Sequence, residues 1–566
     1  MAWDEAWKAA LSDAQHEPVF LVDVGTFAWA DPETFTSTLA GDTFSSQPWV
    51  PGIPASGING SHTVSEIRAN GQSVRIREWT TSRGGFSFSL TSSKPGRHNL
   101  PFTPHRGLHV QIRMGFAGGF SGLGLEVIER GMIDNITHDG DTWWVQCRSM
   151  LDVLRTRYTD TREDGTNAQF FEDAGQTTTL SHSWNSGHGN DLEVDSLDDF
   201  KKDGRAGAVG VAKVEGDSTD GSGRPAWWFV YSAKSAATGA GTLTASGSVD
   251  WFGQSANYTY PAGTKVYHYP VATGKPWNLF ARFIRSSGKT PVSGFDTMPE
   301  EWGGYISRSM VDSGDILNMN NHPALYDRST DPDTSISPKW TPFVLAPVDN
   351  MLRWLESGLG QFNMWPVVLG DQLSVRMAYD YRYFDPDIVD TIDDDWIASL
   401  DGHDLYHPDA AVEYKRVGGA YSAAGDLYSL AGLDPTSRPW LDRFEKTISA
   451  NGLTVDDGTG TTTENSPDNK TCWEAGTAVA QADARTLTTA AHTWYTRIPE
   501  YLKITTRTLR HAPLVPGDLV SVTSAHIIGR EGLYTNTICM VTGVTPDWMR
   551  GRVSLELATL PGAKTG

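Results

Sequence analysis

The chain has 566 residues, of which 39% are hydrophobic and 21 are Trp, and it carries a formal net charge of −22 at pH 7. This length exceeds what one hydrophobic core serves, so we expect roughly three or four domains. The excess of acid excludes tight wrapping around nucleic acid, which requires Lys and Arg against the phosphates. It allows DNA to pass an acidic wall without sticking, because like charges repel.

The first section, residues 1–161, alternates apolar and polar side chains at period two, as half-buried strands do. Strands are predicted over residues 18–26, 84–92 and 107–116, followed by two that flank the turn-forming "HDGD". The strand over 107–116 places four apolar side chains on one face: Leu108, Val110, Ile112 and Met114. We therefore predict an antiparallel barrel or sandwich of six or seven strands, closed by a helix over residues 149–157.

Cysteine usage argues against redox or metal chemistry. The chain has three Cys, Cys147, Cys472 and Cys539, which are odd in number and widely separated. They cannot form a disulfide framework or a Cys-rich metal site on their own, and they fit synthesis in a reducing cytoplasm. Cys147 lies in the alternating strand "DTWWVQCRS", so we predict that it is an inward packing residue with a silent thiol.

Residues 162–270 differ in composition from the first section: Ser, Thr, Gly, Asn and Asp dominate, and aromatic residues occur at intervals among them. This pattern predicts an inserted β module of short strands and generous loops, built like a β-sandwich. Aromatic faces exposed on such a module can stack on sugar rings or on a partner protein. The candidate glycan or partner contacts are Trp184, Trp227, Trp228, Trp251, Tyr258 and Tyr269. The alternative is that these rings fill a small sandwich core.

Residues 271–400 are predicted to form an α+β connecting domain. Helical spacing appears in "KPWNLFARFIRSSGK" (275–289) and in "PVDNMLRWLESGLGQFN" (347–363), and a hairpin that turns at Gly370-Asp371 follows. Residues 401–566 are predicted to form a second barrel, with a flexible loop at 451–470 and a helix near 476–495. Gly543, which stands between Val541 and Val544, predicts a bulge in one of its strands.

A search for chemistry finds no compact signature. No catalytic elbow, Walker loop or zinc-protease motif occurs, and "GFAGGFSGLG" lacks the spacing of a dinucleotide loop. His403 and His407 would share one face of a helix, but Gly402 and Pro408 argue against a helix there. Acidic stretches at 215–223 and 390–404 do not match a calcium loop. We therefore predict no catalytic residues, no cofactor and no metal site.

Four stretches, taken in order, carry a resemblance. They are "RGMIDNITHDGDTWWVQCRSMLDVLRTRY", "KPWNLFARFIRSSGK" with "MPEEWGGYISRSMVD", "MLRWLESGLGQFNMWPVVLGDQLSVRMA" and "YLKITTRTLRHAPLVPGDLVSVT". In this order they resemble the hub proteins of tailed-bacteriophage baseplates and tail tips, including those of siphophages and gene transfer agents. The aromatic insertion has no counterpart in that family. Some hubs carry Cys-ligated iron–sulfur clusters, and with three scattered Cys this chain departs from that variant.

The resemblance implies two tail-tube-like antiparallel β-barrels and a homotrimeric ring in the virion. Such a ring continues the tail tube, contacts the distal tail protein, the tape measure protein and central spike or fibre proteins, and lines the channel for DNA ejection without specific DNA binding. The alternatives are a carbohydrate-binding or carbohydrate-degrading tail protein, or an adhesin that binds a host surface glycan.

Overall fold

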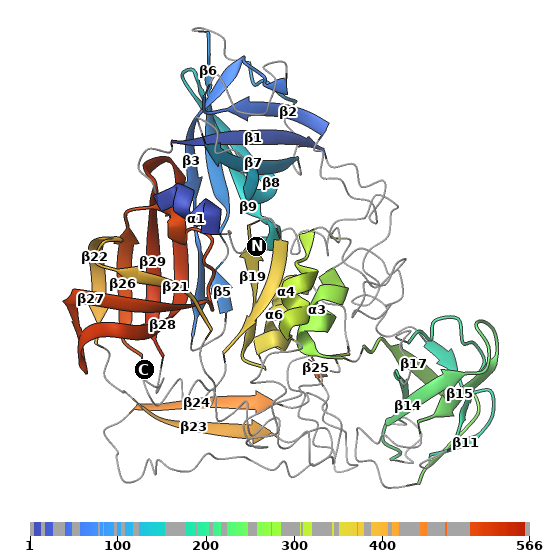
Figure 1. The fold of residues 1–566 in the computed structure, drawn as a ribbon. Helices are drawn as coiled ribbons and strands as arrows, with labels where there is room; N and C mark the ends of the chain where they lie inside the picture. The colour runs from blue at the N-terminus through green and yellow to red at the C-terminus, as the bar shows by residue number, and fades with distance from the viewer. Residues whose placement is uncertain are drawn as a thin grey trace.

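The computed structural model describes a mainly β chain with a few short helices (Figure 1). The described residues are 5–12, 17–26, 40–47, 57–76, 80–82, 84–94, 99–103, 108–116, 124–152, 177–186, 190–202, 208–216, 223–246, 257–272, 274–284, 306, 310–319, 342–343, 350–360, 362–370, 372–378, 387–405, 410–417, 442–449, 470–471 and 499–560. Within these ranges no helix is long and apolar enough to cross a membrane.

The N-terminal section forms a closed barrel of seven strands in the order β1-β2-β3-β6-β9-β8-β7. The strands are β1 (Pro18–Thr26), β2 (Ala40–Ser45), β3 (His62–Ala69), β6 (Phe86–Ser92), β7 (His109–Phe116), β8 (Glu126–Asp139) and β9 (Thr142–Ser149). All neighbours pair antiparallel except β2 and β3, which meet in parallel at the single pair Ser45–Thr63. This confirms the predicted barrel, whose closing helix at 149–157 lies largely outside the described residues.

The barrel core follows from the alternation in its strands. Val110, Ile112 and Met114 on β7 are fully buried in one large hydrophobic cluster. That cluster also contains side chains of the C-terminal strands, such as Val544 and Leu555. The first barrel and the C-terminal sheet therefore share one continuous core.

The inserted module is a six-stranded sheet in the order β10-β17-β13-β14-β15-β12, accompanied by a two-stranded sheet, β11-β16. The strands are β10 (Thr177–Thr179), β11 (Trp184–Asn185), β12 (Leu192–Val194), β13 (Gly210–Val214), β14 (Trp227–Lys234), β15 (Gly241–Ala245), β16 (Thr259–Tyr260) and β17 (Lys265–Tyr269). Its core cluster draws only on residues from Leu180 to Val266. The module thus has a core of its own.

The connecting section contains both predicted helices and the predicted hairpin. Its elements are α3 (Pro276–Ile284), α4 (Ser313–Asn318), α6 (Met351–Gly360), β19 (Met364–Leu369) and β20 (Gln372–Met377). Gly370 begins the hairpin turn after β19 and has a φ of +58°, a left-handed conformation that favours glycine. Trp277, Phe283 and Trp354 belong to one cluster that seals the helices against the hairpin.

The second predicted barrel takes the form of a half-barrel, an eight-stranded sheet whose main path is β21-β27-β28-β29-β26-β22. Its strands are β21 (Ile388–Asp393), β22 (Ile397–Asp404), β26 (Tyr501–Thr506), β27 (Leu519–Gly529), β28 (Gly532–Asp547) and β29 (Arg552–Thr559), joined by β4 (Gln72–Arg75) and β5 (Thr80–Ser82) from the N-terminal section. The register between β28 and β29 shifts between Val541 and Gly543, which confirms the predicted bulge. The boundary predicted at 400/401 falls inside β22.

The remaining described elements are short or separate from the sheets above. They are α1 (Glu5–Ser12), the 3₁₀ turns η6 (Leu509–His511) and η7 (Trp548–Arg550), the parallel pair β23 (Ala410–Val417) and β24 (Asp442–Ser449), and the pair β18 (Pro342–Phe343) and β25 (Lys470–Thr471). The predicted loop 451–470 lies outside the described residues except for Lys470, and the predicted helix near 476–495 lies wholly outside them.

Candidate functional site

Two of the predicted contact aromatics lie in the interior of the inserted module. Trp184 and Trp227 are each 6% exposed and belong to its core cluster. The Trp184 ring packs 6.4 Å from Trp227 and 5.8 Å from Tyr260, measured between ring centroids. For these two residues the structure shows the alternative, a filled sandwich core, because buried rings offer no face to a sugar.

The other predicted aromatics lie elsewhere. Trp228 and Tyr269 are buried outside that core cluster and pack on each other at 5.2 Å between centroids, with the Lys213 ammonium 5.2 Å from the Trp228 ring. Tyr258 is half-buried at the margin of the core, and Trp251 lies outside the described residues. A glycan or partner contact at these four residues stays a prediction.

Cys147 occupies the position that its strand pattern predicts. It pairs with Phe86 on β6 and Ile133 on β8, and its side chain belongs to the shared core. Burial raises the pKa of its thiol well above the usual value, and the nearby carboxyl of Glu129 raises that pKa further. A thiol that stays protonated is a poor nucleophile and a poor metal ligand, so Cys147 is a packing residue.

His403 holds a structural position at the edge of the half-barrel. Its Nε2 lies 3.3 Å from Oε2 of Glu500, which also accepts a hydrogen bond of 3.0 Å from the Tyr534 hydroxyl. His407 lies outside the described residues, and within those residues no group of three His, Cys, Asp or Glu is placed to hold a metal ion. In the acidic stretch 390–404, Asp394 accepts hydrogen bonds from the Ser524 hydroxyl and the Ala525 amide, which anchors the β21–β22 turn to β27.

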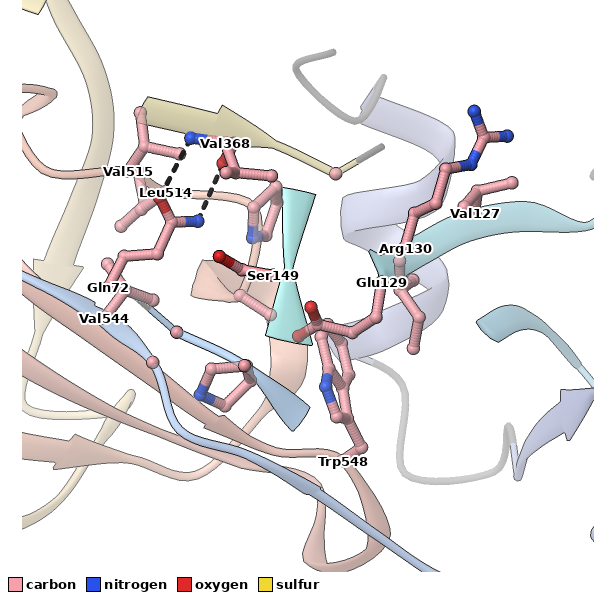
Figure 2. Close-up of a pocket in the computed structure, with 18 residues that line it drawn as sticks. Gln72, Val127, Glu129, Arg130, Ser149, Val368, Leu514, Val515, Val544 and Trp548 are labelled. Atoms are coloured by element: carbon pink, nitrogen blue, oxygen red, sulfur yellow. Dashed lines mark hydrogen bonds between the residues drawn. The ribbon is translucent and has the colours of Figure 1, made fainter. Parts of the chain in front are cut away.

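The clearest site is a cavity of about 60 Å³ where the separate parts of the chain meet (Figure 2). The first barrel contributes Gly84, Gly85, residues 127–130 and Ser149, and the start of β4 contributes Gly71 and Gln72. The β19–β20 hairpin adds Val368 and Gly370, and the C-terminal half-barrel adds residues 512–515, Val544, Pro546 and Trp548. We call this space the junction cavity.

Strand pairing locks one wall of the junction cavity. After β3 the chain leaves the first barrel at Gly71 and enters the C-terminal sheet as β4, where Gln72 pairs with Val544 and Ser73 with Gly543. The Gln72 side-chain amide donates to the Val368 carbonyl (2.8 Å), and its oxygen accepts from the Val368 N–H (3.0 Å). Gln72 therefore extends the backbone pairing into the hairpin and joins three parts of the chain.

Two charged residues, Glu129 and Arg130, are among those that line the cavity. The Arg130 guanidinium points away from the Glu129 carboxyl and donates to the Gln111 side chain (2.7 Å). Gln111 in turn donates to Asp23, whose carboxylate accepts two hydrogen bonds from Arg113, of 2.6 and 2.7 Å. Arg130 is thus committed to a polar network on the barrel and does not neutralise Glu129.

The Glu129 carboxyl faces the indole of Trp548 across the cavity (Figure 2). The Glu129 side chain is half-buried in the cavity wall. Its partial loss of contact with water raises its pKa from 4.5 to about 8, and the nearby Trp548 indole lowers this pKa by a smaller amount. The indole Nε1 reaches no hydrogen-bond partner at full geometry among the described residues, so its help to an ionised carboxyl is limited. Glu129 is therefore a carboxyl that favours its neutral form at the junction.

A β-bulge gives Glu129 this position. The register between β7 and β8 shifts so that Ile112 pairs with Glu129 while Arg113 pairs with Val127, which leaves Ile128 as the extra residue. Bulges re-aim the side chains beside them. The sequence gives no sign of this role for Glu129, because a lone Glu in an alternating strand predicts a solvent-facing position. The neighbouring residues Ile128 and Arg130 do not indicate in the sequence that a bulge occurs here.

Comparisons with known proteins give structural neighbours alone. No family model matches the chain, and no curated protein matches it. Solved structures that match include a 43 kDa tail protein of prophage MuSo2 from Shewanella oneidensis, with 8% identity, a TM-score of 0.35, and coverage of 96% of this chain and 99% of that chain. Prophage tail protein gp18 from Listeria monocytogenes matches with 7% identity, a TM-score of 0.33, and coverage of 96% and 94%.

A chain in the virion of a native gene transfer agent particle matches with 11% identity and a TM-score of 0.18, covering 47% of this chain and 84% of that chain. These neighbours are tail and virion proteins. All three TM-scores are below 0.5, and the descriptions above apply to those proteins.

Proposed function

We propose that this chain is the structural hub of a phage tail tip or baseplate, located in the virion and assembled as a homotrimeric ring. The observation that carries the proposal is the junction of two barrel-like units within one chain. The closed barrel and the half-barrel share a hydrophobic core, and the N-terminal section contributes strand β4 to the half-barrel sheet, which favours a defined arrangement of the two units.

Two barrel-like units per chain would allow a threefold ring to join a sixfold tail tube. Three copies would present six such units, enough to continue a sixfold tail tube as a pseudo-sixfold layer. In this role the ring would contact the distal tail protein and tape measure protein on one side and spike or fibre proteins on the other. DNA would pass through the lumen without specific binding, and the net charge of −22 would reduce its friction with the wall.

The role needs no catalytic group. Among the described residues, several partly buried ion pairs join neighbouring elements of the two barrel-like units. Arg113 holds Asp23 across β7 and β1, and Arg510 holds Asp390 beside α1, so that neighbouring elements are clamped together. Such ion pairs hold neighbouring elements in a fixed geometry, which a structural ring requires.

A deletion separates the hub from the adhesin alternative. Replacing residues 162–270 by a short Gly/Ser linker should leave ring formation intact, because the inserted module has its own core and its own sheets. The measurement is the oligomer mass by mass photometry, together with incorporation into tail particles. If the shortened chain still folds but no longer enters particles, the module rather than the barrels carries assembly, and the hub proposal is wrong.

The same deletion tests the alternatives. An adhesin or carbohydrate-binding protein should lose adsorption to host envelope polysaccharide while particles still form. Release of reducing sugar by the full chain, and its loss from the shortened chain, would favour the carbohydrate-degrading alternative.

A further inference from the structure

The junction cavity places one acidic side chain between the first barrel and the C-terminal half-barrel, beside the hydrophobic core that the two share. Glu129 extends from the first barrel toward Trp548 on η7, and the β4–β28 pairing lies beside it. The bulge at Ile128 is what turns this carboxyl toward the junction. A carboxyl at such a contact controls it, because its ionised form has to be hydrated or paired and its neutral form does not.

No described cation is placed to pair with Glu129. On its own strand, Arg130 is bound to Gln111, and on β9 the thiol of Cys147 stays neutral. In the half-barrel, Asp547 is paired with Arg550 at 3.5 Å and Arg510 is bound to Asp390, and none of these four residues lines the cavity.

The remaining titratable groups near the cavity are engaged elsewhere or neutral. Arg68 on β3 pairs with Glu66. Burial lowers the pKa of His511 to about 4, so this imidazole is neutral. Arg75 on β4 has an interaction partner and does not line the cavity, and the hairpin lines it with Val368 and Gly370, which do not titrate.

We propose that Glu129 is a proton-operated latch between the first barrel and the C-terminal half-barrel. With its proton bound, the carboxyl stays packed against Trp548 and the junction is closed. When the proton leaves to solvent, the carboxylate draws water into the cavity and weakens the contact along η7 and β4. The cavity has room for a few water molecules at about 60 Å³, so hydration can begin without unfolding either barrel.

The direction of the pH effect follows from linkage. The closed junction holds the pKa of Glu129 at about 8, against 4.5 when the carboxyl is hydrated. The free energy of opening the junction is therefore largest below pH 4.5. It falls as the pH rises from 4.5 to about 8, and it does not fall further above pH 8. This inference concerns the joint within one chain and does not depend on the hub proposal.

The test is hydrogen–deuterium exchange of the full chain between about pH 5 and about pH 8, corrected for the intrinsic exchange rate of each amide. In the wild type, amides of residues 70–76 and 542–550 should exchange about tenfold faster or more at the upper pH. The reason is that the equilibrium constant for opening the junction rises by up to a factor of ten per pH unit. Glu129→Gln keeps the shape but stays neutral, so these amides should show no such rise. Glu556→Gln, at an exposed position paired with Lys503, should retain the wild-type rise.

Infrared difference spectra give a second readout that does not rely on the variant's stability. The wild type should show the C=O stretch of a protonated carboxyl that persists at neutral pH, and Glu129→Gln should lack this band. Exchange in Glu129→Gln with the same pH dependence as the wild type would overturn the proposal. A wild-type spectrum with no protonated carboxyl at neutral pH would also overturn it.

Discussion

Replacing Arg376 by methionine should lower the free energy of unfolding by about 3–5 kcal/mol, the usual cost of leaving a buried carboxylate without its cation. The Arg376 guanidinium on β20 binds Asp315 of α4 at 2.5 Å and Asp518, just before β27, at 3.3 Å. Burial raises the pKa of Asp518, and Arg376 opposes this shift by lowering it. Without the cation, Asp518 would remain largely buried without a charge partner, and the connecting section would lose its ionic link to the half-barrel.

Urea unfolding of the variant and the wild type measures the effect. The deficit should shrink as the pH falls toward the pKa of Asp518, because a protonated carboxyl needs no cation. Arg68→Met is the matched control, since Arg68 pairs with Glu66 but is 62% exposed, and exposed ion pairs contribute little to stability. Equal effects of the two substitutions would show that the Arg376 network does not join the two parts.

A side chain at Gly71 should be nearly as damaging. Gly71 has a φ of +76°, and a Cβ there would lie 2.1 Å from Oγ1 of Thr545 and 2.6 Å from the carbonyl oxygen of Val544. Thr545 can turn away, but the carbonyl belongs to the β28 backbone that pairs with β4. We expect Gly71→Ala to cost about 3 kcal/mol or more, as the sum of left-handed strain and overpacking.

Gly140→Ala isolates the backbone contribution. Gly140 also has a positive φ, of +59°, but nothing lies within 4 Å of a Cβ there. This control should cost roughly 1–2 kcal/mol, the penalty of a left-handed residue alone. The denaturant midpoints of both variants, compared with that of the wild type, measure these losses of stability. If Gly71→Ala loses no more stability than Gly140→Ala, the β4 crossing is not tightly packed.

Local patterns were sufficient to predict several elements. Strand β7 forms where the period-two alternation predicts it, although His109 and Gln111 on its polar face are buried as well. Helices α3 and α6 follow their helical spacing, and Gly543 marks its bulge. In each case the signal lies within a few residues of the feature. Period and turn chemistry act locally, so the sequence can report them directly.

Features that depend on distant pairing left no such signal. Strand β4 is the four-residue segment "QSVR", too short for a period, and its partner on β28 lies far along the chain. The junction cavity and the environment of Glu129 arise from that crossing, so they could not be foreseen. For the inserted module, composition predicted aromatic β strands, but it could not separate a core ring such as Trp184 from an exposed one.

The measurement that bears most directly on the hub proposal is electron microscopy of the purified full chain and of tail particles, with symmetry tested rather than imposed. The proposal predicts a ring of three copies around an open lumen, with the closed barrel and the half-barrel alternating around it as six similar units. A chain that remains monomeric at all concentrations, and that lies beside the tail axis in particles, would contradict it.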